Sequence, residues 1–188
     1  MWTMGAVAVM VAGGLVALLV VVGGGNGSAS PPPKPDPVAL TAYTTALRPP
    51  TSEGGRIVQQ EMKPSLSEFG SGTVDGPSFA ARARGWQLAL TRVRDDIDKI
   101  TVPASIPSAG PLFHDAMTAY VHAAQLFEQA GTAPAAQRQS AIDAAVAAAR
   151  AADQAFDRAA LVVQRALRAA GLPPDSALPN PTPSASPG

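Results

Sequence analysis

The longest helical pattern in this chain of 188 residues is an alanine-rich stretch over residues 134–171. Its apolar residues recur in steps of three and four, the spacing that places side chains on one face of an α-helix. These residues are Ile142, Ala145, Ala149, Ala152, Phe156, Ala160, Val163, Leu167 and Ala170. Pro134 suits a first helical position, Gly171 suits the left-handed residue after a helix, and Pro173 prevents continuation. A chain with so long a helix must pack its other segments, as helices, against that apolar face.

Two shorter stretches show the same spacing. In residues 77–100 the apolar positions are Phe79, Ala83, Trp86, Leu90, Val93, Ile97 and Ile100. In residues 111–130 the apolar positions are Phe113, Met117, Tyr120, Ala124 and Phe127. Gly131 is expected to end this helix. Residues 132–133 leave room only for a short turn into the long helix, which favours antiparallel packing of the two neighbours.

Prolines divide the segment that precedes these helices. We expect a short helix over residues 38–48, because the residue before a proline is pushed out of the helical region and Pro49 and Pro50 follow directly. Ser52 would then cap a second helix, which Pro64 kinks or ends.

Residues 38–172 are therefore predicted to form one domain, an all-α, up-and-down bundle of about four helices with the long alanine-rich helix as its last member. The extra length of that helix would either pack against the first short helix or project freely. Residues 173–188 are rich in Pro and Ser and carry too little apolar surface to order themselves. We expect a disordered tail there.

The chain begins with an apolar segment. Residues 5–22 contain no charged residue, and ~18 helical residues span about 27 Å, close to the hydrocarbon thickness of a bilayer. Residues 1–22 are therefore predicted to be a transmembrane anchor or a signal peptide cleaved near Ser28, whereas a buried core helix is disfavoured. Residues 23–37, rich in Gly and then in Pro, form a linker. We expect the bundle to be extracytoplasmic at the cell membrane, or secreted if the segment is cleaved.

Composition excludes several kinds of partner and chemistry. The 14 Lys and Arg residues balance the 14 Asp and Glu residues, so no basic patch points to nucleic acid. The chain has no cysteine, which excludes disulfides and a thiol nucleophile. We expect no cofactor. The partners that remain are the membrane, through residues 5–22, and a second protein or a second copy of the chain bound through the helices.

Residues able to carry chemistry are few. His114 and His122, the two histidines, stand ~80° apart around one predicted helix and too far apart along it to share a metal as an i,i+4 pair does. The Glu-x-x-His pairs of di-iron bundles are missing, and neither histidine has a recognisable catalytic partner. We therefore predict neither a metal site nor an enzyme. If the bundle binds a small ligand, the polar side chains that could face it are Tyr120, His122, His114 and Arg82.

In general plan the chain resembles small actinobacterial envelope proteins, which carry an N-terminal membrane segment, a Pro-rich spacer and an Ala-rich helical domain. The segments that carry the resemblance are residues 5–22, 31–37 and 134–171. Many of those proteins have no assigned function. The resemblance therefore implies an architecture and no functional residue.

Two functions are predicted from these observations. The first is a non-enzymatic, membrane-tethered bundle that acts as a binding or scaffolding module, which predicts an exposed apolar groove or patch along the long helix. The alternative is a carrier of a small ligand or metal in the cell envelope, which requires a cavity between helices with converging polar groups. An enzyme would need a perturbed pair of ionisable groups in a cleft, and no spacing in the sequence proposes one.

Overall fold

The computed structural model describes residues 33–178, and all the regular structure in that range is helical. The elements are α1 (Pro37–Arg56), the π-helix η1 (Ile57–Met62), α2 (Lys63–Gly70), α3 (Gly76–Asp98), α4 (Ala109–Thr132) and α5 (Ala135–Ala169). The all-α prediction is confirmed for the described residues. The predicted membrane segment, residues 1–22, and most of the predicted linker, residues 23–37, lie outside them.

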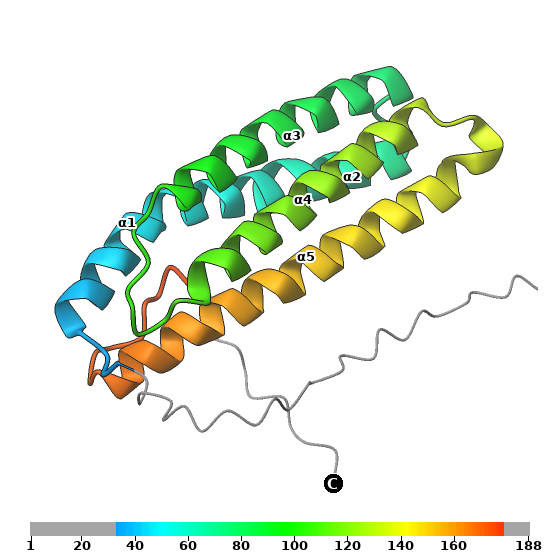
Figure 1. Cartoon of the computed structure of the whole chain (residues 1–188). Coiled ribbons are helices and arrows are strands. Elements are labelled where there is room, and N and C mark those ends of the chain that lie inside the picture. Colours follow the sequence, from blue (N-terminus) through cyan, green and yellow to red (C-terminus); the bar gives the residue numbers. More distant parts are fainter. Residues whose placement is uncertain (1–32, 179–188) are drawn as a thin grey trace, which may run out of the picture. The chain divides into compact units, whose positions relative to one another are not determined.

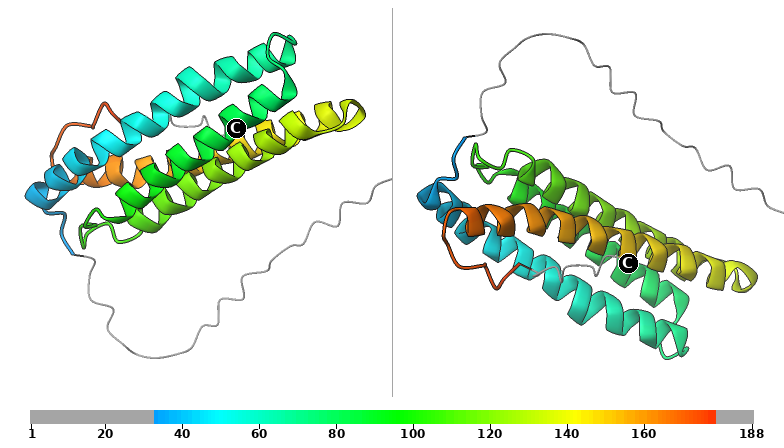
Figure 2. Two further views of the ribbon diagram at one scale, coloured as in Figure 1. Left: turned by 90° about the horizontal axis from the view of Figure 1, so that it is seen from above. Right: turned by 90° about the horizontal axis from the view of Figure 1, so that it is seen from below.

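Within this range the helices form a bundle of four rods (Figure 1). α1, η1 and α2 follow one another without a break and make up one rod, here called the first rod. α3 packs on the first rod and on α4, and α4 packs along α5. The backbone of α5 comes close to the first rod at one end, where its last turns lie beside α1 (Figures 1 and 2). Near the start of α5, the Arg138 guanidinium lies over the Phe69 ring of α2, 5.5 Å from its centroid. The predicted four-helix bundle is therefore present, and its seam between the first rod and α5 is the least closed.

The first rod is longer than predicted, because the helix continues through Pro49, Pro50 and Pro64. Pro49 and Pro50 remove the N–H partners of two carbonyl groups, which belong to the exposed Thr45 and Ala46 and can be solvated by water. Pro64 follows the wide turns of η1, whose π-type hydrogen bonds accommodate a missing donor. Prolines are thus tolerated where the rod faces solvent or widens.

Two expectations for this rod are wrong. The helix does not end at Arg48, and Ser52 lies inside α1 instead of capping a second helix. The cap is Asp36, whose carboxylate accepts a hydrogen bond from the Val38 N–H at 2.9 Å, with Pro37 in the first turn. The apolar side chains that hold the rod on the bundle are buried, and they are Leu40, Tyr43, Leu47, Ile57, Val58, Met62 and Phe69.

Aromatic residues of the core cluster where the first rod, α3 and α4 meet. The rings of Phe69 and Phe79 stack with their centroids 4.2 Å apart, and Phe79 meets Trp86 and Phe127 edge-on at 5.8 and 6.0 Å. Phe79 is fully buried and Trp86 is 4% exposed, so the predicted apolar seam of α3 faces the core. Phe156 of α5 differs, because it is only half-buried although it stands in the middle of the predicted apolar face.

α5 begins and ends close to its predicted limits. Pro134 takes the position just before the helix, and Gly171 has the predicted left-handed conformation, with φ of 72°. The N–H of Leu172 donates to the carbonyl of Leu167 at 2.9 Å, which closes the helix end. The first turn, residues 135–137, is exposed, while the last turns reach α1. The extra length therefore packs against α1, the first of the two predicted alternatives, at the end of α5.

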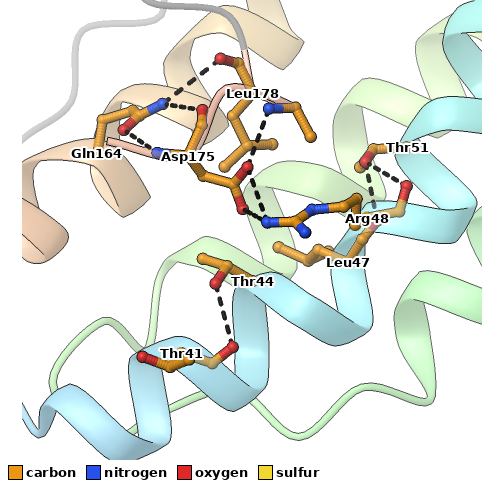
Figure 3. Close-up of polar contacts among 9 residues, drawn as sticks. Thr41, Thr44, Leu47, Arg48, Thr51, Gln164, Asp175 and Leu178 are labelled. Atoms are coloured by element: carbon orange, nitrogen blue, oxygen red, sulfur yellow. Dashed lines mark hydrogen bonds and ion pairs between the residues drawn. The ribbon is translucent and has the colours of Figure 1, made fainter. Parts of the chain in front are cut away.

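The chain after α5 crosses back over the bundle as a short segment, residues 172–178, here called the strap. The buried Gln164 of α5 donates from Nε2 to the carbonyls of Asp175 and Leu178, at 2.8 and 3.4 Å, and accepts from the Asp175 N–H at 3.2 Å (Figure 3). The Asp175 carboxylate also pairs with Arg48 of α1 at 3.3 Å. The disorder predicted from residue 173 onward is therefore wrong as far as Leu178, which is 4% exposed.

Candidate functional site

Two adjoining cavities follow the seam between the first rod and α5. The first has a volume of about 430 Å³ and opens between the end of α1, η1, α4 and α5, with the strap at its edge. Its lining residues are Thr51, Gly54, Gly55, Val58, Gln59, Met117, Tyr120, Asp153, Phe156, Asp157 and Ala177. These residues mix apolar surface with two carboxylates.

The second cavity, of about 260 Å³, lies farther along the seam beside η1 and α2. Its lining residues are Val58, Met62, Lys63, Leu66, Phe127, Val146, Ala149, Arg150 and Asp153. Val58 and Asp153 line both cavities, which are therefore neighbours and are here called together the groove. Apart from its charged residues, the second cavity is lined by apolar side chains.

The groove exists because small residues face it from both sides. Gly54 and Gly55 stand on the first rod, and a Cβ added at Gly55 would meet no atom within 4 Å. On α5, Ala149 is also small and lines the second cavity. Within residues 33–178, α5 makes no close backbone contact with η1 or α2, so side chains do not fill the whole seam.

A short hydrogen bond in the groove joins Tyr120 of α4 to Asp153 of α5. Tyr120 is 7% exposed, and its hydroxyl donates a hydrogen bond to Asp153 Oδ1 at 2.5 Å. Burial, and then the Asp153 carboxylate, raise the pKa of Tyr120 above its ordinary value, so the hydroxyl stays protonated and remains a donor at neutral pH. Asp153 is in this way held in one orientation at the junction of the two cavities.

Both carboxylates of the groove lack a cationic partner. The ion pairs among the described residues involve eight other carboxylates, and neither Asp153 nor Asp157 belongs to any of them. Asp153 Oδ2 accepts no hydrogen bond from the described part of the chain. Asp157 lies one turn further along α5 and also lines the first cavity. The groove therefore presents two acceptor groups with unused capacity.

The four residues predicted to face a ligand do not come together. Tyr120 lines the first cavity. His122 is exposed, and the ring of His114 contacts the Asp98 carboxylate at 3.0 Å, where α4 meets the end of α3. Arg82 pairs with Glu68 at 2.6 Å, where α3 meets α2. Only Tyr120 of the four contributes to the groove.

Sequence reasoning missed Asp153, Asp157 and Gly55. Asp153 and Asp157 flank Phe156 on α5, so an acidic pair one turn apart beside an apolar stripe is the signal that could have shown them. Nothing in the sequence pointed to Gly55. A glycine leaves room for a cavity only where another helix faces it, and the sequence does not show which helix does.

The chemistry available in the groove is that of binding. The Thr51 hydroxyl donates back to the carbonyl of Leu47 at 2.8 Å, and neither histidine is among the residues that line the two cavities of the groove. Over residues 33–178, no three His, Asp or Glu side chains stand close enough together to hold a metal ion. The groove can take up an apolar group, and it can neutralise a cation at its carboxylates.

Two further findings concern membrane spans and similarity to known proteins. None of the helices between residues 33 and 178 combines the length and the apolar character needed to cross a bilayer. The predicted membrane segment, residues 5–22, lies outside that range. Comparison with known proteins found no family model, no curated protein and no solved structure that matches the chain.

Proposed function

We propose that the protein is a non-enzymatic binding module of the cell envelope that holds an amphipathic small molecule in the groove. The observation that carries this proposal is the first cavity itself. Its volume of about 430 Å³ falls within the range of roughly 300 to 1,000 Å³ typical of ligand pockets. Its mostly apolar lining with a few fixed polar groups, Tyr120 and Asp153 among them, is also typical of such pockets.

The tether remains part of the proposal. The apolar length of residues 5–22 supports a single membrane-spanning anchor for the bundle. Cleavage near Ser28 would give a secreted form of the same module. In either case residues 23–37 would leave the bundle free to meet a ligand released from, or delivered to, the membrane surface.

A scaffold for another protein is the second candidate, and the groove beside α5 supports it. A stable protein interface buries about 800 Å² on each partner. Among residues 33–178, the large exposed apolar side chains are Val38 on α1, at 77%, and Leu88 on α3, at 60%, and they line neither cavity of the groove. Separate apolar residues away from the groove favour a small ligand over a broad protein interface.

The experiment that tests the proposal fills the first cavity from the first rod. Gly55→Leu adds a side chain to an exposed helical position with open space, so the fold should tolerate it. Gly85→Leu is the matched control, because Gly85 is likewise exposed, helical and without neighbours, and it lines neither cavity. The full chain, in lipid nanodiscs, is exposed to a long-chain alcohol that carries a photoreactive diazirine.

Trypsin then releases residues 151–158, because Arg150 and Arg158 bound this peptide. We expect mass spectrometry to find the label in that peptide for the wild type and for Gly85→Leu, and to find most of it lost for Gly55→Leu. Comparing variants in the same membrane removes the effect of probe dissolved in lipid. Equal labelling of all three proteins would overturn the proposed function.

A further inference from the structure

We infer that the ligand of the groove is a cationic amphiphile, with a protonated amine at Asp153 and Asp157 and its apolar chain in the second cavity. This inference rests on the proposed function and names the chemical class of ligand that the groove selects. Its basis is the uneven distribution of charge and apolar surface along the groove.

The first cavity is the negatively charged end. Asp153 and Asp157 line it, and no basic side chain does. Tyr120 occupies Oδ1 of Asp153, which leaves Oδ2 to accept from a ligand. An ammonium group has three donors and would form charge-assisted hydrogen bonds there, which are about twice as strong as neutral ones. A neutral head group would gain less, and an anionic head group would be repelled.

The second cavity suits the apolar chain. Met62, Leu66, Phe127, Val146 and Ala149 supply most of its walls. The two basic residues at this end, Lys63 and Arg150, are exposed. Their stems extend the apolar wall while their charged groups stay in water.

Those two charges also set the direction in which a ligand lies. Lys63 Nζ donates to Gln59 Oε1 at 2.6 Å, so its ammonium group stays on the first rod beside Gln59, and Arg150 lines the second cavity from α5. A cationic head group is repelled from this end and attracted to Asp153 and Asp157. An anionic amphiphile would take the opposite direction, with its head group at Lys63 and Arg150, and it is therefore the competing ligand that the experiment must include.

The experiment measures how three amphiphiles of equal chain length displace the photoreactive alcohol from the full chain in nanodiscs. The three probes are dodecylamine, dodecanol and dodecyl sulfate. We expect dodecylamine to displace the label at a concentration about tenfold lower than dodecanol, which corresponds to one charge-assisted contact. Dodecyl sulfate should be the weakest of the three.

Variants separate binding in the groove from partition into lipid. Asp153→Asn keeps an oxygen that can accept from Tyr120, so the fold is preserved while the charge is lost. We expect Asp153→Asn and Asp157→Asn each to reduce the preference for the amine over the alcohol to within about twofold. Asp143→Asn is the matched control, because Asp143 lies exposed on the same helix outside the groove, and it should keep the wild-type preference.

The outcomes distinguish this inference from the proposed function. In one outcome Gly55→Leu reduces the labelling, but dodecylamine displaces the label no better than dodecanol, or dodecyl sulfate displaces it best. That result would overturn the inference of a cationic ligand and would keep the groove as a binding site. Displacement by a basic amphipathic peptide but not by dodecylamine also overturns it, in favour of a protein ligand. Label that Gly55→Leu does not affect removes the groove altogether.

Discussion

At the scale of single residues, the two tyrosines differ in one respect although both are buried. The Tyr120 hydroxyl donates to Asp153, whereas the Tyr43 hydroxyl has no hydrogen-bond partner within the described residues. Burial raises the pKa of Tyr43 to about 12, and burial with the Asp153 carboxylate raises that of Tyr120. At Tyr43, therefore, burial alone raises the pKa of the hydroxyl, without a hydrogen bond to a carboxylate.

Replacing Tyr43 by Phe should leave the free energy of unfolding at neutral pH within about 1 kcal/mol of the wild type, because no hydrogen bond is lost. Between about pH 10 and 12 the unfolded chain releases the Tyr43 proton while the folded chain keeps it. The folded state then binds more protons, so wild-type stability falls as pH rises through this window. Urea unfolding at neutral pH and at a pH within this window measures the change. The free energy of unfolding should fall less for Tyr43→Phe than for the wild type.

Tyr120→Phe serves as the control for that experiment. It removes the donor of Asp153, so stability should fall by about 1 to 2 kcal/mol already at neutral pH. If Tyr43→Phe and wild type lost stability in parallel above pH 10, or if both Phe variants were equally destabilised at neutral pH, the difference between the two hydroxyls would be refuted.

At the scale of elements, the ends of α3, α4 and α5 fall within two residues of those predicted from the sequence. Each has a continuous apolar seam, so the burial that stabilises it is visible in the spacing alone. The first rod could not be predicted in this way, because local proline rules say that a helix ends at Pro49. Burial of side chains on both sides of that point, such as Leu47 and Ile57, outweighs the local rule.

Gly131 is explained by the packing of two helices and not, as predicted, by the end of its own helix. It was expected to end its helix, but α4 continues to Thr132, and among the described residues positive φ occurs only at Gly72 and Gly171. A Cβ at Gly131 would lie 2.7 Å from the carbonyl oxygen of Gly76 and 2.8 Å from the N of Ala80. The residue is therefore glycine because α3 and α4 approach closely there.

We expect Gly131→Ala to lower the free energy of unfolding by about 1 to 3 kcal/mol, because the atoms in the way are rigid backbone. Gly85→Ala, in open space inside α3, should instead raise it by up to about 1 kcal/mol through helix propensity. Urea unfolding of the two variants beside the wild type measures both changes. A stabilising effect at Gly131 would show that α3 and α4 do not pack as closely as described.

At the scale of the whole molecule, the sequence predicted the candidate site only in part. Spacing shows which face of a helix is apolar, and so it placed Tyr120 at a seam. It does not show which helix lies opposite, and for that reason it grouped Tyr120 with His114, His122 and Arg82, which lie at other interfaces or on the surface. Asp153 became a candidate only once α5 was placed beside the first rod.

The strap connects the two rods that border the groove, and its contacts make unequal contributions to stability. Gln164 is 1% exposed and satisfies three backbone groups of the strap. In the ion pair the Arg48 side chain is 57% exposed, while the Asp175 side chain is 5% exposed and also accepts from the Ala177 N–H at 2.9 Å. Exposed ion pairs contribute less than about 1 kcal/mol, while buried polar groups left without partners cost about 1 to 3 kcal/mol each.

Gln164→Leu, which keeps the size of the side chain, should therefore lower the free energy of unfolding by about 2 to 4 kcal/mol. Arg48→Ala should lower it by a smaller amount, about 1 to 2 kcal/mol, because the buried Asp175 carboxylate keeps the Ala177 N–H as a donor. Amide hydrogen exchange adds a local measurement. The N–H of Asp175, which donates to Gln164, should exchange much faster in Gln164→Leu and at a nearly unchanged rate in Arg48→Ala. Because Ala177 of the strap lines the first cavity, release of the strap should also weaken retention of the photoreactive alcohol in Gln164→Leu. Equal exchange rates in the two variants would show that the buried amide of Gln164 holds the strap no more firmly than the ion pair does.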